Sequence, residues 1–233
     1  MIPKIIHYCW FGKNPLPKQV LHCIESWKKF LPDYEIKEWN EDNFDVNEIQ
    51  FTREAYRLKR YAFVSDYVRI YALYHEGGIY IDTDVEVLKS FGNKIDNRSF
   101  MGIELRGRQI ATAVLGSEPK EKWAADMMCY YQNMPFIKWW GKLNSTPNPL
   151  LFNRLFEKYG FDYLDKEYVL ENGTHLYPSM IFCGKDYETG NYIITEDTIC
   201  VHHFAGSWVD KDNRTIDKWR RLFRNLKLKY FSL

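Results

Sequence analysis

The sequence lacks any strong excess of charge and any long apolar run. Its 32 Lys and Arg residues nearly balance its 31 Asp and Glu residues, leaving a net charge of +1. A chain so balanced has no general electrostatic attraction to nucleic acid. No stretch approaches the ~18 apolar residues of a membrane-spanning helix, and the start, MIPKIIHYCW, lacks the form of a signal peptide. We therefore expect a cytoplasmic protein.

The sequence also lacks the cysteine spacings of metal sites and disulfide frameworks. Five cysteines, at positions 9, 23, 129, 183 and 200, form no C-x-x-C pair and are odd in number. This pattern favours free thiols in a reducing compartment. No internal repeat, low-complexity segment or G-x-x-x-x-G-K-[ST] phosphate loop is visible, which argues against enzymes built on such a loop.

Aromatic residues, by contrast, are abundant. They make up 17% of the 233 residues and include eight Trp and seventeen Tyr, a composition suited to stacking on sugars and bases. The length predicts one large domain, alone or with a small appendage.

The order of predicted elements indicates an α/β sheet. We expect a strand over residues 2–10, a helix ending near residue 30, a strand over 35–39 and a short helix within 40–48. A long helix from residue 61 and a buried strand over 79–81 follow. Weaker signals place strands at 100–104 and 110–115 and helices at 118–134 and 150–159. In such alternating sheets ligands bind at the carboxyl ends of the strands.

The most informative stretch, residues 61–86, reads YAFVSDYVRIYALYHEGGIYIDTDVE. Ser65, Asp66 and Arg69 interrupt the apolar helix, and a double glycine ends it. The strand then leads into Asp82 and Asp84, which share a side only if the backbone stays extended. Two carboxylates on one side repel unless a cation lies between them, and a hard divalent ion completed by substrate phosphates suits such a pair. D-x-D alone is more often a solvated turn, but these surroundings favour a metal site.

At this point the chain resembles a known family. The pattern S-D-x-x-R-x-x-x-L-Y-x-x-G-G-I-Y-x-D-x-D looks like the sugar-nucleotide site of the family 32 glycosyltransferases, which include bacterial capsular-polysaccharide transferases. The opening I-P-K-I-I-H-x-x-W-x-G and the closing H-H-x-x-G-S-W are similar to the ends of that family's domain. The resemblance implies a GT-A fold (a Rossmann-like mixed sheet flanked by helices), a nucleotide-sugar donor, Mn²⁺ or Mg²⁺, and retention at the anomeric carbon.

The resemblance also implies roles for individual residues. The predicted metal ligands are Asp82, Asp84 and His202, and the predicted catalytic residues are Asp66, Arg69, Asp82 and Asp84. The predicted contacts to the nucleotide-sugar are His7, Trp10, Ser65, Asp66, Arg69, Tyr80, Asp82, Ser207 and Trp208. No residue is marked as acting on the anomeric carbon.

Two of these assignments leave alternatives open. Trp10 would stack on the nucleobase, with an ordinary buried first strand as the alternative. His202 and His203 are adjacent at the end of a strand and point in opposite directions, so at most one of them faces a given ligand. Without the resemblance, one core histidine and one surface histidine would be the simpler interpretation; the family pattern favours His202.

The last residues form a separate pattern. Over residues 217–233 apolar side chains recur at helical spacing and Lys and Arg occupy the other faces. This predicts a basic amphipathic helix that either lies on the inner face of the cell membrane or packs on its own domain. We therefore divide the chain into a GT-A domain at 1–210 and a helix at 211–233.

The predicted function is a retaining glycosyltransferase. It would move sugar from a UDP-sugar to a glycan or lipid-linked acceptor in bacterial capsular polysaccharide synthesis, with no nucleic-acid partner. The alternatives are a toxin-like protein glycosyltransferase, a metal-dependent phosphohydrolase or nucleotidyltransferase, and a non-catalytic lectin-like or membrane-adaptor module.

Overall fold

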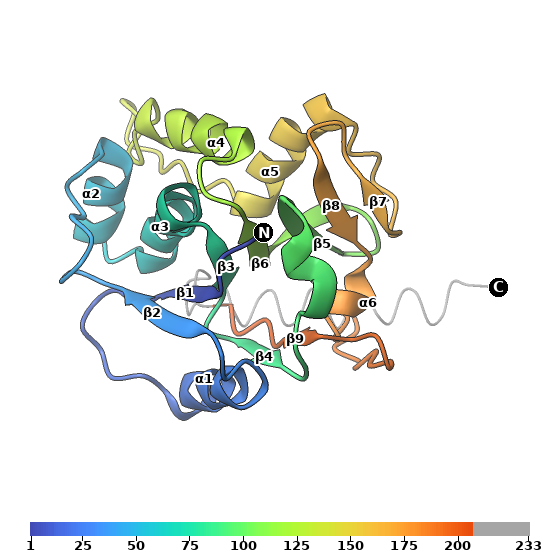
Figure 1. Cartoon of the computed structure of the whole chain (residues 1–233). Helices are drawn as coiled ribbons and strands as arrows, with labels where there is room; N and C mark the ends of the chain where they lie inside the picture. Colours follow the sequence, from blue (N-terminus) through green and yellow to red (C-terminus); the bar gives the residue numbers. More distant parts are fainter. Residues whose placement is uncertain (207–233) are drawn as a thin grey trace, which may run out of the picture.

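A seven-stranded mixed sheet with helices on both faces forms the body of the protein (Figure 1). The computed structural model describes residues 1–206. The predicted contacts Ser207 and Trp208 and the predicted helix at 211–233 lie outside the described residues. The strands follow the order β2-β1-β3-β6-β5-β8-β7. The predicted mixed α/β sheet is confirmed.

The first half of the chain builds the parallel part of the sheet. Strands β1 (Ile5–Cys9), β2 (Glu35–Trp39) and β3 (Gly78–Ile81) run parallel, with β1 in the middle. Helix α1 (Lys18–Phe30) connects β1 to β2, and helices α2 (Gln50–Arg57) and α3 (Tyr61–Glu76) connect β2 to β3. The carboxyl ends of these three strands therefore meet at one edge of the sheet.

The second half completes the sheet with mainly antiparallel pairs. Strand β6 (Gln109–Ser117) lies antiparallel between β3 and β5 (Ser99–Glu104), and β8 (Thr174–Tyr177) with β7 (Tyr168–Val169) closes the far edge. A separate ribbon pairs β4 (Val85–Val87) with β9 (Cys200–His202). The remaining helices are α4 (Lys122–Gln132), α5 (Asn148–Phe156) and α6 (Ser179–Phe182), with 3₁₀ turns at Gly92–Asp96 and Glu157–Tyr159.

Two hydrophobic cores lie on opposite faces of the sheet. Helices α2, α3, α4 and α5 cover one core, while α1, the β4–β9 ribbon and α6 cover the other (Figure 1). The fully buried Trp27 of α1 donates its indole N–H to the Val85 carbonyl at 2.9 Å. This bond ties α1 to β4 and fixes the ribbon against the main sheet.

The double glycine has the role expected for it at the end of α3. Gly77 and Gly78 have φ values of +68° and +100°, in the region that side chains rarely enter. A Cβ on Gly78 would lie 2.6 Å from the Ile5 carbonyl oxygen. The absence of side chains here lets the chain leave the helix and enter the sheet directly beside β1.

One predicted element is wrong. Residues 40–48 form turns, and the helix starts only at Gln50. The reason is local: Asn40 and Asp45 accept hydrogen bonds from backbone N–H groups two residues ahead, at 2.8 and 2.9 Å. Short polar side chains that bond their own backbone in this way favour turns over helix.

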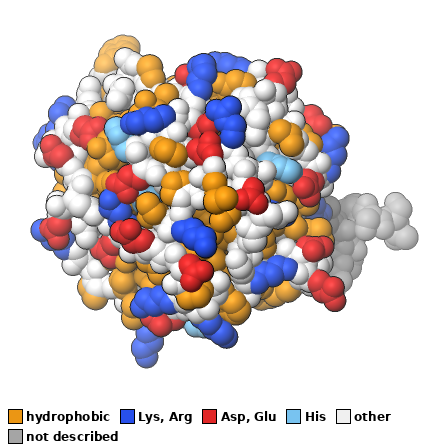
Figure 2. All heavy atoms as spheres, in the orientation of Figure 1, with side chains coloured by type: hydrophobic (Ala, Val, Ile, Leu, Met, Phe, Trp, Pro, Cys, Tyr) orange, Lys and Arg blue, Asp and Glu red, His pale blue; other side chains and the backbone are white. Residues whose placement is uncertain are grey.

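The free thiols and the mixed surface charge are those expected from the composition. All five cysteines lie within the described residues and are free; Cys129 is exposed and the other four are buried. Among residues 1–206, no helix is both long and apolar enough to cross a membrane. Figure 2 shows basic and acidic side chains interspersed over the face that it displays.

Candidate metal and donor site

The D-x-D pair lies in a tight turn between β3 and β4. The Val85 N–H donates to the Asp82 carbonyl at 3.0 Å, so the backbone turns between the two aspartates instead of remaining extended. The condition of an extended backbone set by the sequence argument is therefore not met. The carboxylates nevertheless come together, because the turn folds both side chains to the same place.

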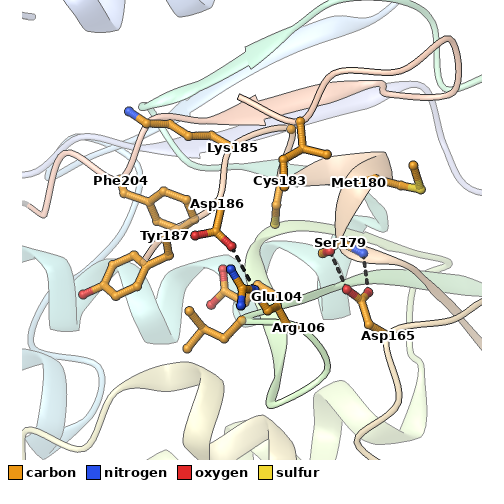
Figure 3. A pocket seen from close by; sticks show the side chains of 13 residues that line it. Glu104, Arg106, Asp165, Ser179, Met180, Cys183, Lys185, Asp186, Tyr187 and Phe204 are labelled. Carbon is orange, nitrogen blue, oxygen red and sulfur yellow. Dashed lines mark hydrogen bonds and ion pairs between the residues drawn. The ribbon is translucent and has the colours of Figure 1, made fainter. Parts of the chain in front are cut away.

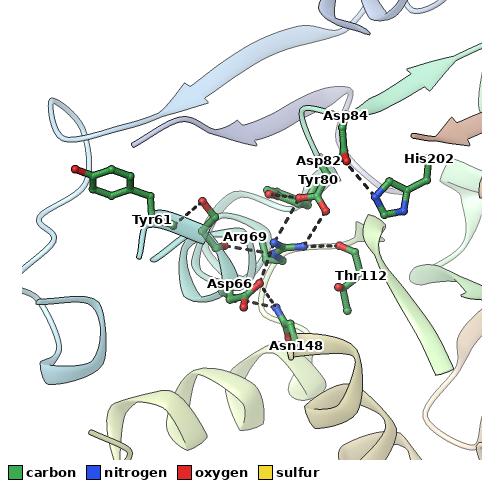
Figure 4. A network of polar contacts seen from close by, with 10 residues as sticks. Tyr61, Asp66, Arg69, Tyr80, Asp82, Asp84, Thr112, Asn148 and His202 are labelled. Carbon is green, nitrogen blue, oxygen red and sulfur yellow. Dashed lines mark hydrogen bonds and ion pairs between the residues drawn. The ribbon is translucent and has the colours of Figure 1, made fainter. Parts of the chain in front are cut away.

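His202 reaches this turn through the β4–β9 ribbon. Val85 lies opposite His202 in the ladder, and His202 Nε2 is 3.4 Å from Asp84 Oδ1 (Figure 4). One potential ligand atom each from Asp82, Asp84 and His202 lie within 4.8 Å of one another. Two carboxylate oxygens and one imidazole nitrogen suit a borderline cation such as Mn²⁺ better than Ca²⁺. The residues predicted as metal ligands thus fit a divalent ion.

The adjacent histidine has a different partner. His203 Nε2 lies 3.1 Å from Glu86 Oε2, and the His203 backbone N–H donates to the Asp84 carbonyl at 2.9 Å. Its ring therefore points away from the D-x-D turn. Of the two histidines, His202 is the one that faces the D-x-D turn.

The two aspartates differ in their electrostatics. Burial by itself would raise the pKa of Asp84, but the His202 ring and a 2.7 Å hydrogen bond from the Ala205 N–H lower it to about 2. Burial raises the pKa of Asp82, and the nearby Asp84 charge adds to the rise against the pull of the Arg69 guanidinium. Asp84 is the stronger anion of the pair.

Arg69 of α3 lies directly beneath Asp82 and is almost fully buried. Its Nη2 is 2.9 Å from Asp66 Oδ1 and 3.4 Å from Asp82 Oδ1, and its Nη1 donates to the Thr112 carbonyl at 2.7 Å (Figure 4). Its Nε donates to the Ser65 carbonyl at 3.3 Å. Burial would lower the pKa of Arg69, but Asp82 and Asp66 raise it.

The partners seen for Arg69 are all protein groups, and its predicted contact with the donor stays a prediction. Its guanidinium is enclosed by protein groups, and its planar fork holds Asp82 and Asp66 in fixed positions. Tyr80, which is predicted to pack on the nucleotide, likewise has protein partners. Its ring is 2% exposed and lies 4.6 Å from the Arg69 guanidinium carbon, and its hydroxyl donates to Asp82 Oδ1 at 2.7 Å.

The ligand contact predicted for His7 does not fit its place in the fold. Strand β1 is an inner strand, and the His7 side chain is fully buried. Its Nδ1 accepts from the Trp39 indole at 3.0 Å, so its Nε2 carries the proton and donates to the Gly77 carbonyl at 2.7 Å. Burial lowers the pKa of His7, which keeps the ring neutral. His7 joins β1, β2 and the glycine turn and cannot reach a ligand from there.

Trp10, Asp66 and Ser65 are each partly exposed in this region. Trp10 follows β1, is half-buried and lines a polar pocket with Asn14 and the loop at residues 38–42. Asp66 is half-buried and accepts from the Asn148 amide at 3.2 Å, and burial raises its pKa to about 6. Ser65 is half-buried and donates to the Tyr61 carbonyl at 3.2 Å. Their contacts with a nucleotide-sugar stay predictions.

Three residues of this region were missed by the sequence argument. Asn148 begins α5, and its side-chain amide donates to Asp66. Phe204 has a φ of +55°, and the centre of its ring lies 3.9 Å from the centre of the His202 ring. Glu104 ends β5, and its Oε2 lies 3.9 Å from His202 Nδ1. Asn148 and Phe204 belong to loops or element ends with no recognisable local pattern. Glu104 follows a predicted strand, but nothing in the sequence links it to His202.

Comparison with known proteins agrees with the D-x-D turn as the centre of the site. Residues 17–101 match the family model described as a glycosyltransferase sugar-binding region containing a DXD motif. The matched segment runs from the end of the first loop to the middle of β5 and contains Asp66, Arg69, Asp82 and Asp84.

Two curated relatives match over similar lengths. Inositol phosphoceramide mannosyltransferase 3 of Schizosaccharomyces pombe is 34% identical over 92 residues, covering 36% of this chain and 24% of that protein. Subversion of eukaryotic traffic protein A of Legionella pneumophila is 26% identical over 121 residues, covering 40% of this chain and 19% of that protein. The aligned regions thus span a quarter or less of these relatives.

A solved structure shows that the likeness extends to the fold. A glycosyltransferase involved in glycosylation of the PBCV-1 major capsid superimposes with a TM-score of 0.53 at 12% identity, covering 92% of this chain and all of that one. The predicted GT-A fold is confirmed.

Proposed function

We propose that this protein is a metal-dependent glycosyltransferase that uses a nucleotide-sugar donor. The observation that carries the proposal is the convergence of Asp82, Asp84 and His202 at the carboxyl end of β3. The two aspartates lie inside the segment that matches the sugar-binding family model, and His202 joins them from outside it. A phosphate-binding glycine loop is absent from the sequence, so a bound divalent ion is the natural partner for the donor's diphosphate.

A bound Mn²⁺ or Mg²⁺ would neutralise the charge that grows on the departing nucleoside diphosphate. The protein's own contribution is to prepare this position before the donor arrives. Arg69, held by the Thr112 carbonyl, fixes Asp82, while the Ala205 N–H and His202 fix Asp84. Because these groups are already oriented, little reorganisation is needed when the glycosyl–phosphate bond breaks.

Features of the site and the name of one relative support a proposed donor and acceptor. Trp10, with its polar pocket at the carboxyl ends of β1 and β2, is placed to stack on the base of a UDP-sugar. Asp66 would accept hydroxyl groups of the donor sugar. The name of the yeast relative, a mannosyltransferase for an inositol phosphoceramide, favours a lipid-linked or glycan acceptor.

The proposal also includes the stereochemistry of transfer, its cellular location and its biological role. Transfer would proceed with retention at the anomeric carbon, in the cytoplasm or at the inner face of the cell membrane, and would serve surface polysaccharide synthesis. Ser207 and Trp208, next in the chain after the loop that covers Asp84, would close over the diphosphate.

The test is donor hydrolysis across a panel of sugar nucleotides with Mn²⁺, repeated with EDTA and with Asp84→Asn. The asparagine keeps an oxygen that can accept from the Ala205 N–H but removes the charge, so folding should persist while turnover falls by about 10²–10³-fold. Asp197→Asn, in an exposed loop, is the matched control and should retain wild-type turnover. Release of UDP from one donor that is lost in Asp84→Asn would establish the transferase.

Other results would select among the alternatives. Release of inorganic phosphate would indicate a phosphohydrolase. Transfer to a polypeptide, and not to a glycan or lipid, would indicate a toxin-like protein glycosyltransferase. Absence of both turnover and donor binding in calorimetry would leave a binding module.

A further inference from the structure

We infer that Glu104 is a positioning residue of the metal site that acts through His202. The inference rests on the proposed metal site and adds a residue outside the matched family segment, 17–101. Glu104 lies at the carboxyl end of β5 and His202 at the end of β9, so two strands far apart in sequence bring them together.

Unpaired atoms carry this inference. Within the described part of the chain, four buried side-chain nitrogen or oxygen atoms lack a hydrogen-bond partner: Glu104 Oε2, Trp123 Nε1, Asn148 Oδ1 and His202 Nδ1. Two of these four, Glu104 Oε2 and His202 Nδ1, face each other at 3.9 Å. A buried polar atom without a partner is destabilising, so each of the two is the obvious partner for the other.

The gap is small and the surroundings hold both groups close to the bonded position. A shift of about 1 Å would bring the two atoms to the usual N–H···O distance. The other Glu104 oxygen accepts from the Gln109 amide, which fixes the carboxylate. The Phe204 ring covers the His202 ring at 3.9 Å, which restricts the imidazole to small rotations.

The consequence is a defined tautomer. If the Nδ1–H of His202 donates to Glu104, its Nε2 carries a lone pair, and Nε2 is the atom that faces Asp84 and the metal position. Ligating histidines commonly donate their second ring nitrogen to a carboxylate in this way, which orients the ring and strengthens the ligand. Glu104 would thereby orient His202 toward a bound metal ion.

A competing role is contact with a substrate. Glu104 also lines a pocket with Lys185, Tyr187 and Phe204, next to the ion pair between Arg106 and Asp186 (Figure 3). The unpaired oxygen is nevertheless buried, and its nearest unpaired neighbour is His202. We therefore assign Glu104 to the metal site, and the experiment below separates the two roles.

The experiment is Mn²⁺ titration by calorimetry without donor, on wild type, Glu104→Ala and Glu104→Gln. Loss of the carboxylate should weaken Mn²⁺ binding by about 10–100-fold in Glu104→Ala. Glu104→Gln keeps an acceptor oxygen and should lose less. Glu121→Gln is the matched control, because Glu121 is an equally buried carboxylate whose partner is Arg98, and its Mn²⁺ affinity should be unchanged.

A double-mutant cycle distinguishes positioning from general damage to the fold. In a His202→Gln background, Glu104→Gln should have no further effect on Mn²⁺ affinity, because its route to the metal has been removed. An equal loss in both backgrounds would overturn the inference, as would unchanged Mn²⁺ affinity in Glu104→Ala. Loss of turnover with acceptor at unchanged metal affinity would assign Glu104 to the pocket instead. If the wild type itself binds no metal, the proposed function fails first.

Discussion

Asp66 and Asp84 are similarly buried carboxylates, with side chains 14% and 17% exposed, yet their acidities are opposite. Burial raises the pKa of Asp66 to about 6 despite the adjacent Arg69. At Asp84 burial is outweighed by His202 and by the Ala205 N–H, and the pKa falls to about 2. At similar exposure the balance of neighbours decides the direction: the Asp82 charge adds to burial at Asp66, while the His202 charge and two hydrogen-bond donors outweigh burial at Asp84.

The difference divides the site into a supporting half and a binding half. Around Arg69 the protein supplies its own cation, which Asp66 and Asp82 share. Asp84 has no full permanent positive charge of this kind, because His202 must be neutral to bind a metal. When ionised, the three carboxylates and one guanidinium leave two negative charges, which one divalent ion would balance. Asp82 belongs to both halves and connects them.

The largest effect should come from removing the shared cation. Arg69→Met leaves Asp66 and Asp82 without their buried partner, and breaking a buried pair in this way costs about 3–5 kcal/mol in the free energy of unfolding. Urea denaturation measures it, and Lys28→Met, which breaks an exposed pair with Glu25, is the control that should change stability little. A small loss in Arg69→Met would mean that Arg69 does not hold the two carboxylates together.

The next effect is a pH dependence of stability that arises from the raised pKa of Asp66, in contrast to the lowered pKa of Asp84. The pKa of Asp66 in the folded state is about 6, above its ordinary value of 3.8, so folding favours the protonated form. The stability from this group is full below about pH 4 and is lost as pH rises through 6, a total of about 2–3 kcal/mol.

Asp66→Asn mimics the protonated carboxyl and should lack this slope. The measurement is the difference between wild-type and Asp66→Asn unfolding free energies from pH 4 to 7. Asp197→Asn, which replaces an exposed aspartate, supplies the control curve. A wild-type curve parallel to that of Asp66→Asn would show that Arg69 keeps Asp66 ionised throughout.

The smallest effect lies in the binding half. Burial would lower the pKa of His202, but Asp84 and Glu104 raise it above 6.5. A proton must therefore leave before the ring can bind a metal, and Mn²⁺ affinity should rise with pH by at most about tenfold per unit below that pKa.

Calorimetric Mn²⁺ titrations at pH 6, 7 and 8 test this dependence. His202→Gln, which cannot be protonated in this range, should bind more weakly and with a flatter pH dependence. An equal slope in both proteins would show that the released proton comes from another group.

The four charged residues around the D-x-D turn could be singled out from the sequence because they are close together in the chain. Asp66, Arg69, Asp82 and Asp84 fall within twenty residues of a helix–glycine–strand unit, and each element has a clear pattern. The predicted strand at 35–39 and the predicted strand before the D-x-D pair are confirmed for the same reason.

Sequence patterns were least informative where a side chain's direction depends on the rest of the fold. The His7 ring is hydrogen-bonded to Trp39 and Gly77, which lie 32 and 70 residues away in the chain. The Arg69 guanidinium points inward to Thr112 and Asp82, which lie 43 and 13 residues away. Periodicity assigns such residues to a helix or strand but does not reveal whether their polar atoms are already paired.

What the sequence determined by itself is the α/β order, the position of the D-x-D turn and the acidic character of the site, because propensity, glycine positions and charge act over short distances. The tertiary structure alone decided which groups share charge. The β4–β9 ribbon brings His202 to Asp84 and sends His203 to Glu86, and the end of β5 places Glu104 behind His202. Those pairings join residues 98 to 118 positions apart in the chain, a separation over which no local pattern acts.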